Sequence, residues 1–163
     1  MAGRGFSLGV ALLALALWSG VALAAEAPTR AEYVERAEPL CAATAERTDP
    51  LFSMVRADVK RERVRPAGRA LHRAARMIAT LNKGLRRIPK PPADAETLTA
   101  WLGHLEDQTT LAAKAGSLMS EGRRTKVAGY LSRLVHAGTQ ANDTVLGFGF
   151  DKCLFRFGKL PKA

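Results

Sequence analysis

The chain has 163 residues, 47% of them apolar, and carries 25 Lys and Arg against 15 Asp and Glu, a formal net charge of +10. This length argues against a multidomain protein, and the apolar fraction is ordinary for a globular domain. The charge is uneven, because Arg56 to Lys90 holds twelve basic and two acidic residues while the remaining chain after residue 24 is almost neutral. We therefore expect any charge-dependent function to lie in this segment.

The first 24 residues differ from the rest of the chain. Arg4 is followed by the uncharged stretch LGVALLALAL, by Ser19-Gly20 and by Ala22-Leu23-Ala24. A short basic start, an apolar middle and small residues at the last and third-last positions are typical of a secretory signal peptide. We predict a signal peptide over 1–24, cleaved after Ala24, and one domain over 25–163. An uncleaved membrane anchor is the alternative, because the uncharged stretch is just long enough to span a bilayer.

Two cysteines follow, Cys41 and Cys153. An even number of cysteines in an exported chain predicts a disulfide, which here would join the first helix to the C-terminal tail. A two-thiol redox centre is the alternative, and the absence of a C-x-x-C motif disfavours it.

A capping box formed by Thr29 and Glu32 predicts the start of the first helix. Pro39 should kink this helix, and Asp49-Pro50 should restart it, so we expect two pieces with one aligned apolar face. That face comprises Val34, Ala37, Cys41, Ala45, Thr48, Leu51 and Val55. Glu32, Glu35 and Glu46 are expected on its solvated side, and Glu38 is expected beside the apolar face.

The second helix is expected between Arg65 and Ile88, and it has two chemically distinct faces. Its apolar face comprises Leu71, Ala74, Ile78, Leu81, Leu85 and Ile88. The opposite face carries the candidate anion-binding residues Arg69, Arg73, Arg76, Lys83, Arg87 and Lys90.

Two more amphipathic helices complete the prediction. The third is capped by Asp94 and ends at Glu121-Gly122, and the fourth ends at Gly147. Their apolar faces comprise Leu98, Trp101, Leu105, Ala112, Ala115 and Met119, and Val127, Leu131, Leu134, Gly138, Ala141 and Val145. Gln108 lies in phase with the third face and is either a hydrogen-bonded core amide or a ligand contact. Short connections favour an all-α, up-down-up-down four-helix bundle.

The tail after the fourth helix is rich in phenylalanine, at Phe148, Phe150, Phe155 and Phe157. We expect these rings to close the open end of the bundle, where Cys153 must reach the first helix. An exposed aromatic patch for a partner or a membrane is the alternative.

Four features together resemble small exported or lipid-anchored helical proteins of actinobacteria that have no assigned function. They are Cys41 in the first helix, PKPPAD at 89–94, Trp101-Leu102 early in the third helix, and GFGFDKC at 147–153. The resemblance implies the helical fold and the exported location, and it implies no activity. Many such proteins carry a lipid-attachment cysteine at the signal site, and this chain does not.

Motifs for catalysis or cofactor binding are absent from the sequence. His72, His104 and His136 fall on three different helices off their apolar faces, and neither E-x-x-H nor C-x-x-C-H occurs. No G-x-S-x-G motif, Walker loop or dinucleotide-binding glycine pattern is present. We therefore expect no enzyme, no catalytic residue, no metal site and no cofactor.

The basic face of the second helix is either a plain solvated surface or a binding surface for an anionic envelope polymer or lipid headgroup. Nucleic acid is not expected as a partner, because no aromatic residue lies between Arg56 and Lys90 to stack on bases. A carrier or enzyme that uses the bundle interior near Gln108 is the alternative function. The sequence does not indicate an oligomeric state.

Overall fold

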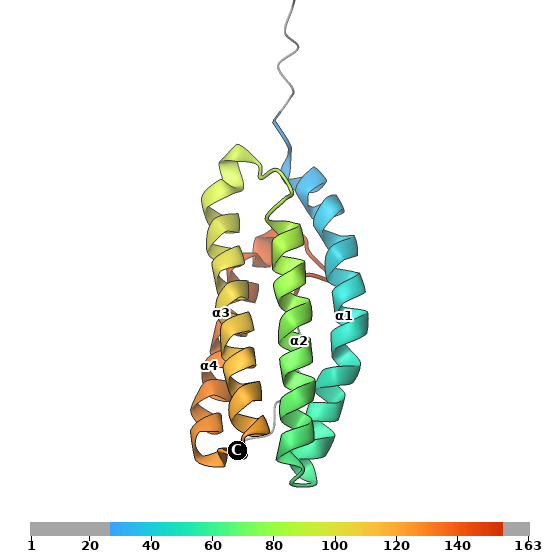
Figure 1. Ribbon diagram of the computed structural model, residues 1–163. Coiled ribbons are helices and arrows are strands. Elements are labelled where there is room, and N and C mark those ends of the chain that lie inside the picture. Colours follow the sequence, from blue (N-terminus) through green and yellow to red (C-terminus); the bar gives the residue numbers. More distant parts are fainter. Residues whose placement is uncertain (1–26, 155–163) are drawn as a thin grey trace, which may run out of the picture.

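The computed structural model describes residues 27–154, which form an up-down-up-down four-helix bundle closed by one disulfide (Figure 1). The helices are α1 (Arg30–Lys60), α2 (Val64–Leu85), α3 (Ala95–Ser120) and α4 (Arg124–Thr144), with 3-10 turns η1 (Pro92–Asp94) and η2 (Leu146–Phe148). Successive helices pack against each other, and α4 lies behind α3 in Figure 1. The predicted fold class is confirmed. The signal-peptide and anchor predictions fall on residues outside the described range. Within residues 27–154, no helix is long and apolar enough to cross a membrane.

α1 is one continuous helix of 31 residues, so the expected division into two pieces is wrong. The capping box is confirmed, since the Thr29 side chain accepts from the Glu32 backbone amide and Glu32 Oε2 accepts from the Thr29 amide at 2.7 Å. Pro39 and Pro50 both lie inside the helix and are exposed. Each removes one backbone donor on the solvent side, where water can bond the carbonyl that is left without a partner.

The start of α3 differs from the prediction in its chemistry. Asp94 occupies the N-cap position, but its side chain makes no capping hydrogen bond. Its carboxylate instead accepts from Arg30, with Nε to Oδ2 at 2.9 Å and Nη2 to Oδ1 at 2.5 Å. The 3-10 turn before α3 places Asp94 beside the first turn of α1, and a charged partner there outweighs a local cap. Asp94 therefore fastens α1 to the connection between α2 and α3.

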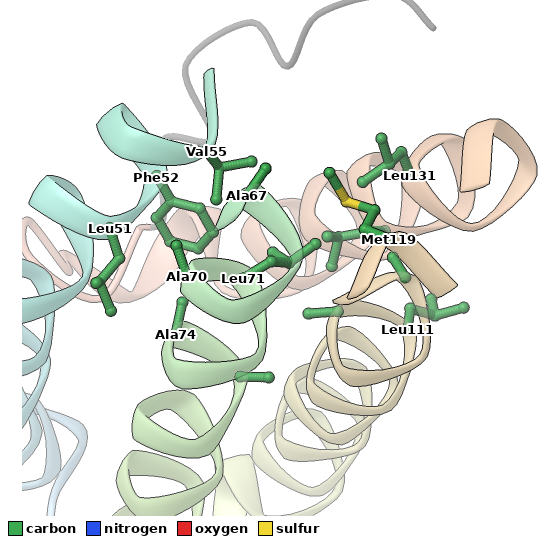
Figure 2. Close-up of a cluster of buried hydrophobic side chains, with 14 of the residues drawn as sticks. Leu51, Phe52, Val55, Ala67, Ala70, Leu71, Ala74, Leu111, Met119 and Leu131 are labelled. Carbon is green, nitrogen blue, oxygen red and sulfur yellow. The ribbon is translucent and has the colours of Figure 1, made fainter. Parts of the chain in front are cut away.

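The apolar faces meet in two clusters. The alanine-rich core lies toward the α1–α2 and α3–α4 connections (Figure 2). It contains Leu51, Phe52, Val55, Ala67, Ala70, Leu71, Ala74, Ala75, Ile78, Leu111, Ala112, Ala115, Leu118, Met119, Val127, Leu131, Leu134 and Ala137. The aromatic core, at the other end, contains Tyr33, Ala37, Cys41, Leu81, Leu85, Leu98, Trp101, Leu102, Leu105, Ala141, Val145, Phe150 and Cys153. Most predicted face positions are buried, while Val34, Ala45 and Ile88 are only half-buried.

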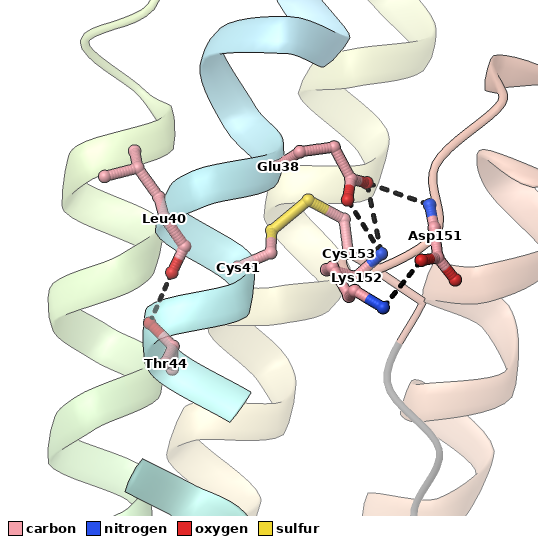
Figure 3. Close-up of a disulfide and its surroundings, with 7 residues drawn as sticks. All are labelled: Glu38, Leu40, Cys41, Thr44, Asp151, Lys152 and Cys153. Carbon is pink, nitrogen blue, oxygen red and sulfur yellow. Dashed lines mark hydrogen bonds and ion pairs between the residues drawn. A yellow bond between two sulfur atoms is a disulfide. The ribbon is translucent and has the colours of Figure 1, made fainter. Parts of the chain in front are cut away.

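The tail joins α4 to α1 across the aromatic core. Cys153 is bonded to Cys41 with an S–S distance of 2.04 Å and a Cα–Cα distance of 5.0 Å, which confirms the predicted disulfide (Figure 3). Glu38 reinforces this junction, because its carboxylate accepts from the backbone amides of Asp151 and Lys152, each at 2.9 Å. Glu38 is half-buried, in agreement with its expected position beside the apolar face.

Of the tail phenylalanines, the structure describes two: Phe150 is buried in the aromatic core and Phe148 is half-buried against it, as the predicted closure of the bundle requires. Phe150 stacks on Trp101 at 5.2 Å between ring centroids and meets Tyr33 edge-on at 6.5 Å. Phe148 stacks on Phe150 at 5.8 Å. The predictions for Phe155 and Phe157 fall on residues outside the described range.

Candidate anion-binding face

Five of the six candidate residues share one exposed side of α2 and its C-terminal extension. Arg69, Arg73, Arg76, Lys83 and Arg87 are all exposed. Their spacings of 4, 3, 7 and 4 residues keep them on the side opposite the buried apolar residues. We call these five residues the cationic face. Arg65, one turn before Arg69, is also exposed and extends this side, and the sequence prediction omitted it.

The side chains of the cationic face make no hydrogen bond or ion pair with any residue in the described part of the chain. Nearby basic residues do have partners. Arg86 pairs with Glu106 at 2.8 Å, and Arg63 pairs with Asp58. The five charges of the cationic face are therefore not neutralised by these carboxylates.

Lys90 differs from the other five candidates. It is half-buried, and its Nζ donates to Thr99 Oγ1 at 2.6 Å. This bond fastens the connection after α2 to the first turns of α3. Lys90 has a structural contact and is not part of the cationic face.

A groove of about 550 Å³ runs between α2 and α3 beside the cationic face. We call it the α2–α3 groove, and it is lined by Arg69, His72, Arg73, Arg76, Ser117, Ser120 and Glu121. Three guanidinium groups thus face one carboxylate, which pairs with Arg123 at 3.4 Å. Guanidinium and hydroxyl groups are hydrogen-bond donors, so the lining suits an oxyanion.

Two buried glycines explain why α2 and α3 come close at this groove. A Cβ atom on Gly68 would lie 2.6 Å from the Gly116 carbonyl oxygen and 2.6 Å from the Ser120 amide nitrogen. A Cβ atom on Gly116 would lie 2.9 Å from the Gly68 carbonyl oxygen. Real Cβ atoms do not approach backbone this closely, so the crossing requires glycine at both positions. It brings the two serines of α3 next to the arginines of α2.

A second groove, of about 620 Å³, lies between α3 and α4. It is lined by Thr109, Thr110, Leu111, Ala113, Lys114, Ser117, Tyr130 and Arg133. The Arg133 guanidinium lies 5.9 Å from the Tyr130 ring centroid, and Ser117 borders both grooves. Its two cations, Lys114 and Arg133, come from different helices, whereas the α2–α3 groove has three arginines on one helix.

The histidines do not converge. His72 borders the α2–α3 groove, His104 is half-buried on α3 and His136 is exposed on α4. Residues 27–154 contain no group of three or more His, Cys, Asp or Glu that could hold a metal ion.

Gln108 is fully buried, and its Nε2 donates to the Ala137 carbonyl at 3.4 Å, while its Oε1 has no partner within residues 27–154. Neither groove described above includes it. The amide therefore joins α3 to α4 in the core, and we do not propose the carrier or enzyme alternative.

The aromatic core holds further polar atoms. Tyr33 Oη and Trp101 Nε1 are buried without a hydrogen-bond partner in the described part of the chain. Burial raises the pKa of Tyr33 to about 12. These groups lie in the core beneath the tail, away from the cationic face.

Comparison with known protein families, with characterised proteins and with solved structures finds no match to this chain. We therefore infer function from the geometry of the surface.

Proposed function

We propose that this protein is exported and binds an anionic polymer or lipid headgroup of the cell envelope through the cationic face. The observation that supports the proposal is the alignment of Arg69, Arg73, Arg76, Lys83 and Arg87 on one exposed side, without partners among the described residues. A solvated surface needs charge but does not need it concentrated on one helix.

The face is long enough for several simultaneous contacts. The 22 residues of α2 extend about 33 Å at 1.5 Å per residue. Each Lys or Arg held near an anionic bilayer adds about 1 kcal/mol of binding free energy, and added salt weakens the attraction. Insertion into lipid is not part of the proposal, because the apolar side of α2 is already buried in the bundle.

Two features support export. The Cys41–Cys153 disulfide is compatible with an oxidising compartment, and the first 24 residues have the pattern of a signal peptide. An envelope location would place the cationic face beside anionic lipids and polymers.

Co-sedimentation tests the proposal. The full chain, expressed through an oxidising export route, is mixed with phosphatidylglycerol vesicles, phosphatidylcholine vesicles or isolated envelope polymer across a salt series. We expect anion-selective binding that weakens as salt rises. The variant with Arg69, Arg73, Arg76, Lys83 and Arg87 changed to Gln should lose it.

A matched control separates a binding face from general charge. Changing the exposed residues Arg36, Arg47, Lys60, Arg61 and Lys126 to Gln removes the same number of charges elsewhere. The control should retain most of the binding. Equal losses in the two variants, or no binding by the unaltered protein, would refute the proposal.

A further inference from the structure

We infer that the α2–α3 groove is a specific site for a phosphate ester group, presented by a lipid headgroup or by a small phosphate ester in solution. The inference rests on the proposed function, since it names the group that the cationic face would recognise. It adds a defined position to what would otherwise be a diffuse attraction.

α2 supplies three guanidinium groups to the groove. Arg69 and Arg73 are one helical turn apart, and Arg76 follows within another turn, so all three reach the same groove. A guanidinium group presents a planar fork of N–H donors that matches two oxygens of a phosphate. Their side chains have no partner among the described residues, so no ion pair must break when a ligand binds.

α3 supplies hydroxyl donors from the opposite wall of the groove. Ser117 and Ser120 line the groove, and neither hydroxyl hydrogen-bonds to another residue within the described range. The Gly68–Gly116 crossing holds this wall against α2. A tetrahedral phosphate needs donors from more than one direction, and the two walls provide them.

The other end of the cationic face lacks this arrangement. Near Lys83 and Arg87, the α3 side chain Glu106 pairs with Arg86 at 2.8 Å. A carboxylate there repels an anion where hydroxyls would bind one. The phosphate position is thus predicted at the Arg69–Arg76 end, and Lys83 and Arg87 contribute only long-range attraction.

The groove is larger than one phosphate group. Its volume of about 550 Å³ lies within the range of small-molecule sites, so the rest of an ester also fits. Glu121 is the one acidic side chain in the lining, and its carboxylate pairs with Arg123 at the exposed surface. Changing Glu121 to Gln should therefore strengthen phosphate binding.

Amide chemical shifts of the full, oxidised chain test the site during titration with inorganic phosphate and with glycerol phosphate, at constant ionic strength set by chloride. We expect saturable shifts at His72, Ser117 and Ser120. The double variant Ser117→Ala/Ser120→Ala should weaken binding about tenfold, since hydrogen bonds to a charged group are lost. The control Lys83→Gln/Arg87→Gln should change the affinity less than about twofold, because these two charges are not part of the groove lining and exposed charges at a distance act weakly. Circular dichroism of each variant verifies its helical fold, so that a loss of binding is not due to unfolding.

The outcomes separate this inference from the proposed function. Suppose that the five-residue charge variant loses vesicle binding, but the groove amides show no saturable shifts or the serine variant keeps its phosphate affinity. This result would refute the phosphate site and leave the proposed role of the cationic face intact. If the groove amides show saturable shifts but the charge variant and its control bind vesicles equally, the proposed role of the cationic face is refuted and the phosphate site is retained. If glycerol phosphate displaces the protein from phosphatidylglycerol vesicles, the lipid headgroup occupies the groove. If glycerol phosphate binds without displacing it, the site serves a free ester.

Discussion

The two ends of the bundle are held together in different ways. At one end, the aromatic core combines stacked rings with a disulfide and with Arg30, whose guanidinium pairs with Asp94 and lies 4.5 Å from the Phe148 ring centroid. At the other end, the alanine-rich core is built on small side chains and on the contact between Gly68 and Gly116.

The difference shows how one short chain can combine a covalently closed end with a solvent-accessible groove at the other end. Large rings and a covalent bond fix the end where the tail, α1 and α3 meet. Small residues allow α2 and α3 to approach at the other end, and the groove that results exposes three arginines. Changes at the two ends should therefore have separable consequences.

The largest effect is expected from removal of the disulfide. Changing Cys41 and Cys153 to Ala should lower the free energy of unfolding by up to about 5 kcal/mol, because the closed loop restricts the unfolded chain. Hydrogen exchange should show faster opening at residues 150–153 and in the first turns of α1 than around Gly68. Uniform loss of protection along all four helices would contradict the division into two ends.

The glycine contact gives a matched pair of substitutions. Gly68→Ala forces a Cβ atom against backbone and should destabilise the protein by about 1–3 kcal/mol, as overpacking does. Gly103→Ala places its Cβ atom in open space within α3 and should stabilise the helix by up to about 1 kcal/mol. Thermal or denaturant unfolding measures both. If Gly68→Ala stabilises the protein, α2 and α3 do not approach each other as closely at this position as described.

Alkaline pH should weaken the aromatic core through Tyr33. The folded pKa of about 12 lies above the usual tyrosine value of 10.0, so the unfolded chain releases this proton first. The stability contribution is complete below pH 10 and is lost as pH rises toward 12, at about 1.4 kcal/mol per pH unit. At pH 11, Tyr33→Phe should have lost less stability relative to pH 8 than the unaltered protein. Parallel pH profiles would contradict this assignment.

Acidification should remove the contribution of the Arg30–Asp94 ion pair to stability, and we expect this to be the smallest of the four effects. The hydrogen-bonded Arg30 guanidinium lowers the pKa of Asp94 below its usual value, so the pair stabilises the fold above that value. This stabilisation is lost as pH falls through the lowered pKa. Arg30→Gln should thus be less stable than the unaltered protein at pH 7, with a difference that narrows on acidification. A difference that stays constant to low pH would exclude the ion pair as its cause.

Local sequence patterns were sufficient to predict the helices, their buried faces and the disulfide partners, because helical period, capping and cysteine number are properties of neighbouring residues. Contacts between distant residues were not predictable in this way. Asp94 has a local capping position but takes Arg30, 64 residues away, as its partner. The Gly68–Gly116 crossing depends on how two helices align in space, although two glycines within helices at core positions were a usable signal. Pro39 and Pro50 do not divide α1 as the sequence predicts, because both prolines lie on the solvent side of the helix.

The most direct test of the cationic face uses the unaltered protein. Arginine-specific chemical modification, read by mass spectrometry with and without phosphatidylglycerol vesicles, measures the reactivity of each exposed guanidinium. We predict that Arg69, Arg73, Arg76 and Arg87 become protected while Arg36 and Arg47 on α1 react as before. Equal reactivity of all six arginines in the presence and absence of vesicles, or stronger protection on α1, would contradict a binding face on α2.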